Sequence, residues 1–98
     1  MITTIAGIVS DNGDKRSGDG FASKRDGQGI YEITFTKAFK TIYGGSVTQI
    51  YWDEDGNTRD NAVISQLDTT KLRLKTGDGS GNKTNREFTF IVVGDLSY

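Results

Sequence analysis

One stretch decides the fold: Gly27-Gln28-Gly29-Ile30-Tyr31-Glu32-Ile33-Thr34-Phe35. Its glycines favour a tight turn, because glycine adopts positive φ without steric cost. After the turn, apolar and polar residues alternate, and successive side chains of a strand point to opposite faces. The stretch therefore predicts a half-buried β-strand that leaves a glycine turn. A second run, Phe88-Thr89-Phe90-Ile91-Val92-Val93-Gly94, alternates in the same way near the other end. Together the two runs predict a compact all-β unit.

The remaining sequence reads as short strands between clusters of turn residues. Strands are predicted over residues 5–10, 20–25, 30–36, 47–52, 62–67, 71–76 and 86–93. A helix over residues 60–70 is the alternative for one of them, but β-branched Val63 and Ile64 favour a strand. Residues 15–19 are expected to be irregular, and residues 37–45 are expected to be a connection. About seven or eight short strands at this spacing predict an antiparallel β-sandwich or jelly roll.

Alternation also predicts which side chains form the core. The expected core consists of Ile8, Phe21, Tyr31, Ile33, Phe35, Val47, Ile64, Leu72, Leu74, Phe88, Phe90 and Val92. The length of 98 residues suits a single domain over residues 1–98. The apolar fraction of 34% is low, which is typical of a β domain with one solvated face or of one stabilised by assembly.

The charge balance argues against nucleic-acid binding. The chain has 12 basic and 13 acidic residues, whereas nucleic-acid binding needs a concentrated basic surface. The cations of Lys71-Leu72-Arg73-Leu74-Lys75 are expected on the solvent side of an amphipathic strand. The first residues, Met1-Ile2-Thr3-Thr4-Ile5, lack the cationic and apolar regions of a signal peptide. No run approaches the roughly 20 apolar residues of a membrane span, so no membrane insertion is expected.

The residue types that usually carry catalysis are missing. The chain has no histidine and no cysteine, which excludes disulfides, the usual nucleophilic triads and nearly all zinc sites. A carboxylate pair drawn from Asp53, Glu54, Asp55 and Asp60 would remain for glycoside hydrolysis. Such chemistry needs a deep cleft, which a small domain with few apolar residues is not expected to build. The sequence therefore predicts no enzyme and no cofactor.

The segment Asp53-Glu54-Asp55-Gly56-Asn57 resembles a calcium loop only in composition. An EF-hand loop needs glycine at its sixth position and glutamate at its twelfth. Here Gly56 is fourth and the twelfth position is Ile64. The sequence instead predicts a β-hairpin loop with Asp55-Gly56 as its turn, and no metal site. The segment Asp78-Gly79-Ser80-Gly81-Asn82 lacks the lysine and helix of a phosphate loop and is also expected to be a hairpin loop.

The pair Tyr51-Trp52 is the most suggestive feature for function. If both lie on a strand, one ring faces the core and the other is exposed. An exposed aromatic ring beside polar side chains is typical of a sugar site. The predicted ligand-binding set is Tyr51, Trp52, Asp53, Asp55, Asn57 and Arg59. The alternative is that both rings pack, one in the core and one in a subunit interface.

Four short motifs carry a resemblance to a known family. They are Ile8-Val9-Ser10, Ser17-Gly18-Asp19-Gly20-Phe21, the stretch from Gly29 to Phe35 followed by Phe39, and the run from Phe88 to Gly94. Over roughly residues 5–95, the chain resembles the small C-terminal β-sandwich modules of phage tail fibres and related virion proteins. It is similar, more distantly, to H-type lectin domains, which are sandwiches that trimerise and bind sugars.

The resemblance implies a non-enzymatic virion adhesion module at the tip of a fibre. Such a module would form a homotrimer, contact other virion proteins and recognise a glycan of the host surface. Two alternatives stay open: a structural virion protein without ligand, such as a capsid decoration or fibre-capping unit, and a free-standing lectin. The sequence departs from the family after Phe39, where Lys40-Thr41-Ile42-Tyr43-Gly44-Gly45 replaces the usual proline. The 53–60 loop is not part of the pattern, so the resemblance assigns no sugar-binding residue.

Overall fold

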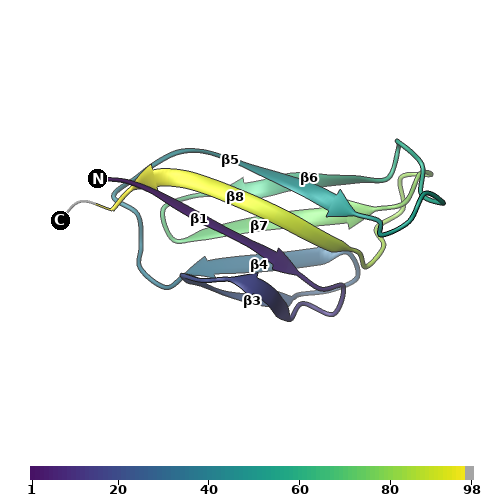
Figure 1. Ribbon diagram of the computed structural model, residues 1–98, viewed down its shortest axis with the longest axis horizontal. Helices are drawn as coiled ribbons and strands as arrows, with labels where there is room; N and C mark the ends of the chain where they lie inside the picture. The colour runs from purple at the N-terminus through teal and green to yellow at the C-terminus, as the bar shows by residue number, and fades with distance from the viewer. Residues whose placement is uncertain (97–98) are drawn as a thin grey trace.

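The protein is an antiparallel β-sandwich, as the sequence predicts. The structure, a computed structural model, describes residues 1–96, which contain eight strands and no helix (Figure 1). Sheet A has the strand order β2-β1-β8-β5, and sheet B has the order β3-β4-β7-β6. The strands are β1 (Ile2–Val9), β2 (Lys15–Gly18), β3 (Phe21–Arg25), β4 (Ile30–Phe35), β5 (Thr41–Ile50), β6 (Asn61–Leu67), β7 (Lys71–Gly77) and β8 (Glu87–Asp95).

Two strand predictions need correction. Residues 15–19 were expected to be irregular, but β2 pairs with β1 at the edge of sheet A, and its four residues are all exposed. Residues 37–45 were expected to be a connection, but β5 begins at Thr41 and pairs with β8 over its whole length. β5 also ends at Ile50, before the predicted end of the 47–52 strand. The strand predicted in place of a helix at β6 is confirmed.

The two longest connections cross between the sheets. Residues 51–60 join β5 of sheet A to β6 of sheet B, and residues 78–86 join β7 of sheet B to β8 of sheet A. The prediction of a β-hairpin loop is therefore wrong for residues 53–60, because β5 and β6 lie in different sheets and do not pair. Residues 78–82 do form a small hairpin loop, which the antiparallel bridge between Gly77 and Lys83 closes. Gly56 does not have the positive φ that a turn at Asp55-Gly56 would need. The glycine turn before β4 does join paired strands, with φ of 124° at Gly27 and 67° at Gly29.

The core lies between the sheets and follows most of the predicted alternation. Tyr31, Ile33, Leu72, Leu74 and the three inward side chains of β8 are fully or almost fully buried. Three aromatic pairs build it: Phe21 with Phe90, Phe35 with Phe39, and Tyr31 with Phe88, with centroid separations of 4.8, 5.1 and 5.0 Å. Edge-to-face and tilted packing of this kind is favoured over a face-to-face stack.

Three of the predicted core residues differ in the structure. Val47 and Ile64 are only partly buried and pack against the edge of the core. Ile8 alternates with fully buried Val9 and points away from the core, so its assignment was wrong by one position. Phe39, in the connection between β4 and β5, is buried and was not predicted.

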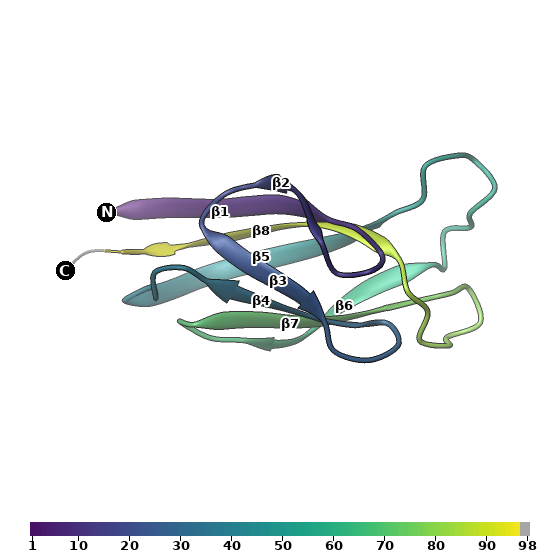
Figure 2. The same cartoon turned by 90° about the horizontal axis from the view of Figure 1, so that it is seen from below.

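The sandwich has two distinct ends. The chain termini lie at one end, and the loops of residues 51–60 and 78–86 lie at the other, here called the loop end (Figures 1 and 2). The molecule is 45 Å long and 21 Å wide. At the loop end, the Gln49 side chain of sheet A donates hydrogen bonds of 2.8 Å to the carbonyl oxygens of Asn61 and Gly77 in sheet B. These bonds fix the position from which both loops leave the sandwich.

Candidate functional site at the loop end

Both rings of the Tyr51-Trp52 pair are exposed. Because β5 ends at Ile50, neither residue follows strand alternation, and neither ring enters the core. The exposed fraction is 45% for Tyr51 and 69% for Trp52. The expectation that one ring is buried in the core is therefore wrong. The finding leaves two neighbouring aromatic rings at the solvent surface of the loop end.

Trp52 lies beside an ion pair that the sequence did not reveal. Arg16 of β2 donates hydrogen bonds of 2.8 and 2.9 Å to the two carboxylate oxygens of Glu87 in β8. The guanidinium carbon of Arg16 lies 5.9 Å from the centroid of the Trp52 ring. Both bonds come from Nη1 of Arg16, and as charge-assisted hydrogen bonds they hold the guanidinium beside the carboxylate. The surface around Trp52 thus combines a large apolar ring with fixed polar groups.

Tyr51 is held by Arg86 on one side and by the backbone of its own loop on another. The guanidinium carbon of Arg86 lies 5.1 Å from the centroid of the Tyr51 ring. A Cβ atom on Gly56 would lie 2.8 Å from the same ring, so the loop backbone passes close over Tyr51. Only glycine permits this approach, and the contact limits how far the ring can move.

The polar residues of the predicted set mainly shape the loop. The amide of Asp55 donates to Asp53 Oδ1 at 2.8 Å, and the amide of Arg59 donates to Asn57 Oδ1 at 2.8 Å. The amide of Asn57 donates to Asp60 Oδ2 at 3.3 Å. These are side-chain turns of the kind that Asp and Asn form with nearby backbone. Asp53 and Asn57 therefore already use one side-chain oxygen each within the loop.

The two inter-sheet loops are in contact. A Cβ atom on Gly79 would collide with the side-chain amide of Asn57, which shows how closely the loops approach. The second loop is organised by Asp78, whose carboxylate accepts hydrogen bonds from the amides of Ser80 and Asn82 and from the Asn82 side chain. These donors, first the Asn82 amide, hold the pKa of Asp78 below its usual value.

The structure divides the predicted set between two sides of the loop end. Tyr51 and Trp52 lie with Arg86 and Arg16. Arg59 instead lines an open groove on the outer face of sheet B. The predicted residues therefore form one loop but do not converge on one point. Arg16, Glu87 and Arg86 were missed, because they lie far from the 51–60 loop in sequence and carry no local motif.

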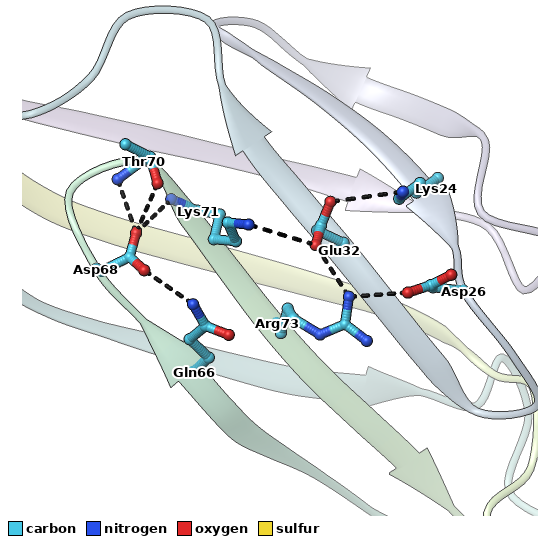
Figure 3. Close-up of polar contacts among 8 residues, drawn as sticks. All are labelled: Lys24, Asp26, Glu32, Gln66, Asp68, Thr70, Lys71 and Arg73. Carbon is cyan, nitrogen blue, oxygen red and sulfur yellow. Dashed lines mark hydrogen bonds and ion pairs between the residues drawn. The ribbon is translucent and has the colours of Figure 1, made fainter.

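A larger ionic network lies on the outer face of sheet B (Figure 3). Arg73 donates hydrogen bonds of 2.9 Å to both Asp26 and Glu32. Lys24 and Lys71 add ion pairs to Glu32 at 3.7 and 3.9 Å. The Arg73 hydrogen bond is the main cause that lowers the pKa of each carboxyl group. The outward position of Lys71, Arg73 and Lys75 follows the prediction for this strand.

Asp68 closes the β6–β7 hairpin beside this network. Its carboxylate accepts hydrogen bonds from the Gln66 side chain, from the amide and hydroxyl of Thr70, and from the amide of Lys71 (Figure 3). These donors, first the Gln66 side chain, hold the pKa of Asp68 far below its usual value. The carboxylate is thus a structural acceptor in a tight turn.

The described residues do not assemble a metal centre. Within residues 1–96, no three acidic side chains converge on a point that could hold a cation. This part of the chain also has no helix of the length and apolar character needed to cross a bilayer. Comparisons with known proteins add no relative: no family model, no curated protein and no solved structure matches this chain significantly.

Proposed function

We propose that the protein is a non-enzymatic adhesion module at the tip of a virion fibre and that it recognises a glycan on the host surface. The observation that carries the proposal is the exposure of Trp52 beside the Arg16–Glu87 pair. A sugar presents an apolar face of C–H groups and a rim of hydroxyl groups. An exposed indole offers the matching apolar surface, and a fixed ion pair offers hydrogen-bond partners for the rim.

The position of these groups supports the proposal as well. The 51–60 loop, which carries Tyr51 and Trp52, lies at the loop end, opposite to the chain termini (Figure 2). A module joined to a fibre through its termini would present this end outward. In this proposal the protein is made in the host cytoplasm and works in the virion, where it contacts other virion proteins.

A homotrimer is part of the proposal, and an uncharged sheet surface supports it. On the outer face of sheet A, the outward positions of β1, β8 and β5 carry no charged residue between the two ends of these strands. We call these residues the uncharged face: Ile2, Thr4, Ala6, Ile8, Ser46, Thr48, Ile50, Thr89, Ile91 and Val93. The outer face of sheet B, in contrast, carries the ionic network. Depletion of charge is the mark of an interface core.

The same face favours one alternative. A structural virion protein, such as a capsid decoration or fibre-capping unit, would use the uncharged face to dock and would need no ligand. The exposed Trp52 is not explained by that alternative, since it lies at the loop end. A free-standing lectin would keep the sugar site and would bind glycans without other virion proteins.

The test of the sugar site compares two exposed aromatic residues. Trp52→Ala should abolish binding to a glycan array and to host cells, while the melting temperature stays unchanged. Tyr43→Ala removes a ring of similar exposure, 58%, on the distant part of β5 and should leave binding intact. Unchanged binding by Trp52→Ala, or no binding by the parent protein to any glycan or cell surface, would contradict the proposal.

The test of the trimer compares two equally exposed aliphatic residues. Ile91 in the uncharged face is 44% exposed, and Val63 on sheet B is 45% exposed. Ile91→Lys should convert the trimer to monomers in sedimentation velocity, because it places a charge in the interface. Val63→Lys should leave the trimer intact. A parent protein that sediments as a monomer at micromolar concentration would contradict this part of the proposal.

A further inference from the structure

The outer face of sheet B holds an open groove beside the ionic network. Its volume is about 740 Å³, within the range of roughly 300–1,000 Å³ that is usual for ligand sites. β6 and β7 form the floor, the 77–83 segment forms one wall, and Arg59 of the other loop reaches the groove. Ile30 and half-exposed Val63 give the floor an apolar surface. The groove thus combines an aliphatic floor with polar walls.

The charges in this groove do not balance. Four cations line it, Arg59, Arg73, Lys75 and Lys83, against one carboxylate, Asp78. The Asp78 carboxylate accepts three hydrogen bonds inside its own loop, and Arg73 is bound by Asp26 and Glu32. The other three cations, Arg59, Lys75 and Lys83, have no ionic partner among residues 1–96. The groove therefore has an excess of positive charge.

The register of sheet B explains why this excess exists. Arg73 lies opposite Glu32 in β4, so its charge is neutralised across the strands. The next outward residue of β7 is Lys75, which lies between Ile30 of β4 and Val63 of β6. Neither neighbour can pair with an ammonium group. The cross-strand ion pairing stops where the groove begins.

The wall of the groove is built before any ligand arrives. The Thr76 hydroxyl donates to the carbonyl oxygen of Thr84 at 2.6 Å, and the amide of Thr84 donates to the carbonyl of Thr76 at 3.1 Å. Gly77 and Lys83 form an isolated β-bridge across the base of the loop. These bonds fix the stem from which Lys83 projects. A preformed wall lowers the entropy cost of binding.

We propose that this groove binds the negatively charged residue of an acidic saccharide, with Arg59, Lys75 and Lys83 around the carboxylate or phosphate and Val63 and Ile30 under the sugar ring. The inference rests on the proposed glycan recognition and names the class of glycan. It adds a second contact region to the one at Trp52. The lining contains no aromatic ring on which a nucleic-acid base could stack, which favours a saccharide over a single-stranded nucleic acid.

The experiment uses acidic probes and their uncharged counterparts. Trigalacturonate and glucose 6-phosphate are titrated into the ¹⁵N-labelled protein beside trigalacturonate methyl ester and glucose. The acidic probes should shift the amide signals of Val63, Lys75 and Ser80. The uncharged counterparts should bind at least about tenfold more weakly, because they lack the charge-assisted hydrogen bond. Added salt should weaken the binding of the acidic probes, because it screens the charges. The inference would be overturned if neither acidic probe shifted these amide signals, or if trigalacturonate and its methyl ester bound equally well.

Matched variants locate the contact. Lys75→Gln should weaken the binding of acidic probes about tenfold. Lys40→Gln removes the same charge just before β5, outside the groove, and should have no effect. Equal losses from both variants would show a diffuse charge effect and would overturn the inference, as would tighter binding of a single-stranded oligonucleotide. Trp52→Ala separates the two proposals: loss of host-cell binding in that variant, without a loss in Lys75→Gln, would uphold glycan recognition and refute the groove.

Discussion

The phenol oxygen of Tyr31 lies 2.7 Å from the carbonyl oxygen of Asp11, to which it donates a hydrogen bond. The same oxygen accepts a hydrogen bond of 3.0 Å from the amide of Arg86. One buried side chain of β4 thus ties the β1–β2 turn and the segment before β8 together. A tyrosine hydroxyl group is protonated at neutral pH and can donate, and burial raises the pKa of Tyr31 further.

Tyr31→Phe should reduce the free energy of unfolding by about 1–3 kcal/mol, because two part-buried hydrogen bonds are lost, one to the Asp11 carbonyl and one from the Arg86 amide. Urea denaturation measures the change. Tyr43→Phe removes the same atom from an exposed ring and should change stability by less than about 0.5 kcal/mol. Equal effects of the two substitutions would show that the Tyr31 hydroxyl group has no structural role.

Gly29→Ala should destabilise the protein by about 3 kcal/mol, because the new side chain meets strain and backbone together. Gly29 has φ of 67°, and a Cβ atom there would lie 2.7 Å from the Thr76 carbonyl oxygen. Gly44→Ala is the matched control, since Gly44 has no positive φ and no atom within 4 Å of the new Cβ. Thermal melts of both variants test the difference, and a stable Gly29→Ala protein would contradict the close approach.

Stability should fall as the pH is lowered below about 5. The folded-state pKa values of Asp26, Glu32 and Asp78 are lowered, so the unfolded chain takes up protons first on acidification. Their stabilising effect is complete above the unfolded pKa and is lost as pH falls through the folded pKa. Melting temperatures between pH 7 and pH 2 measure the loss. Glu32→Gln should flatten the curve more than Glu54→Gln does, and an identical flattening would contradict the role of the network.

Gln49→Glu should destabilise the loop end at neutral pH by about 2 kcal/mol or more, because a carboxylate would face the carbonyl oxygens of Asn61 and Gly77. Desolvation and these carbonyls would raise the pKa of the new acid, so its protonated form can donate one hydrogen bond. The deficit against the parent protein should therefore shrink as the pH falls. Urea denaturation at pH 7 and pH 4 tests this, and a deficit that grows at pH 4 would contradict it.

Alternation predicted the fold where an inward position carries a large side chain, as in β4, β7 and β8. It failed where the inward position carries glycine. Gly7 of β1 faces the core, and the ring of Phe21 fills the space beside it. A Cβ atom added at Gly7 would lie only 2.5 Å from that ring. The gap in the pattern made Ile8 look buried in place of Val9. β2 has no apolar residue at all, so only its pairing with β1 reveals it.

The candidate site shows the same division between local and long-range information. The sequence indicated the Tyr51-Trp52 pair, since aromatic residues beside a polar loop form a local pattern. It could not indicate that Arg16 stands beside Trp52, because that contact depends on how the edge strand β2 lies relative to the end of β5. Nor could it show that Arg59 faces a different side of the loop end. Such placements follow from the packing of the two sheets.

The shared end of the two chain termini has a mechanical consequence. β1 and β8 are antiparallel neighbours, and Ile2 lies opposite Asp95. A force that pulls the two termini apart would open this ladder one hydrogen bond after another, at low load. A force between the termini and a ligand held at the loop end would instead run along the 45 Å axis, parallel to the strands. If the ligand is held by the 51–60 loop, that load slides β5 past β8 and stretches the hydrogen bonds between these two strands together. The fold therefore resists tension better along this axis than between the two termini.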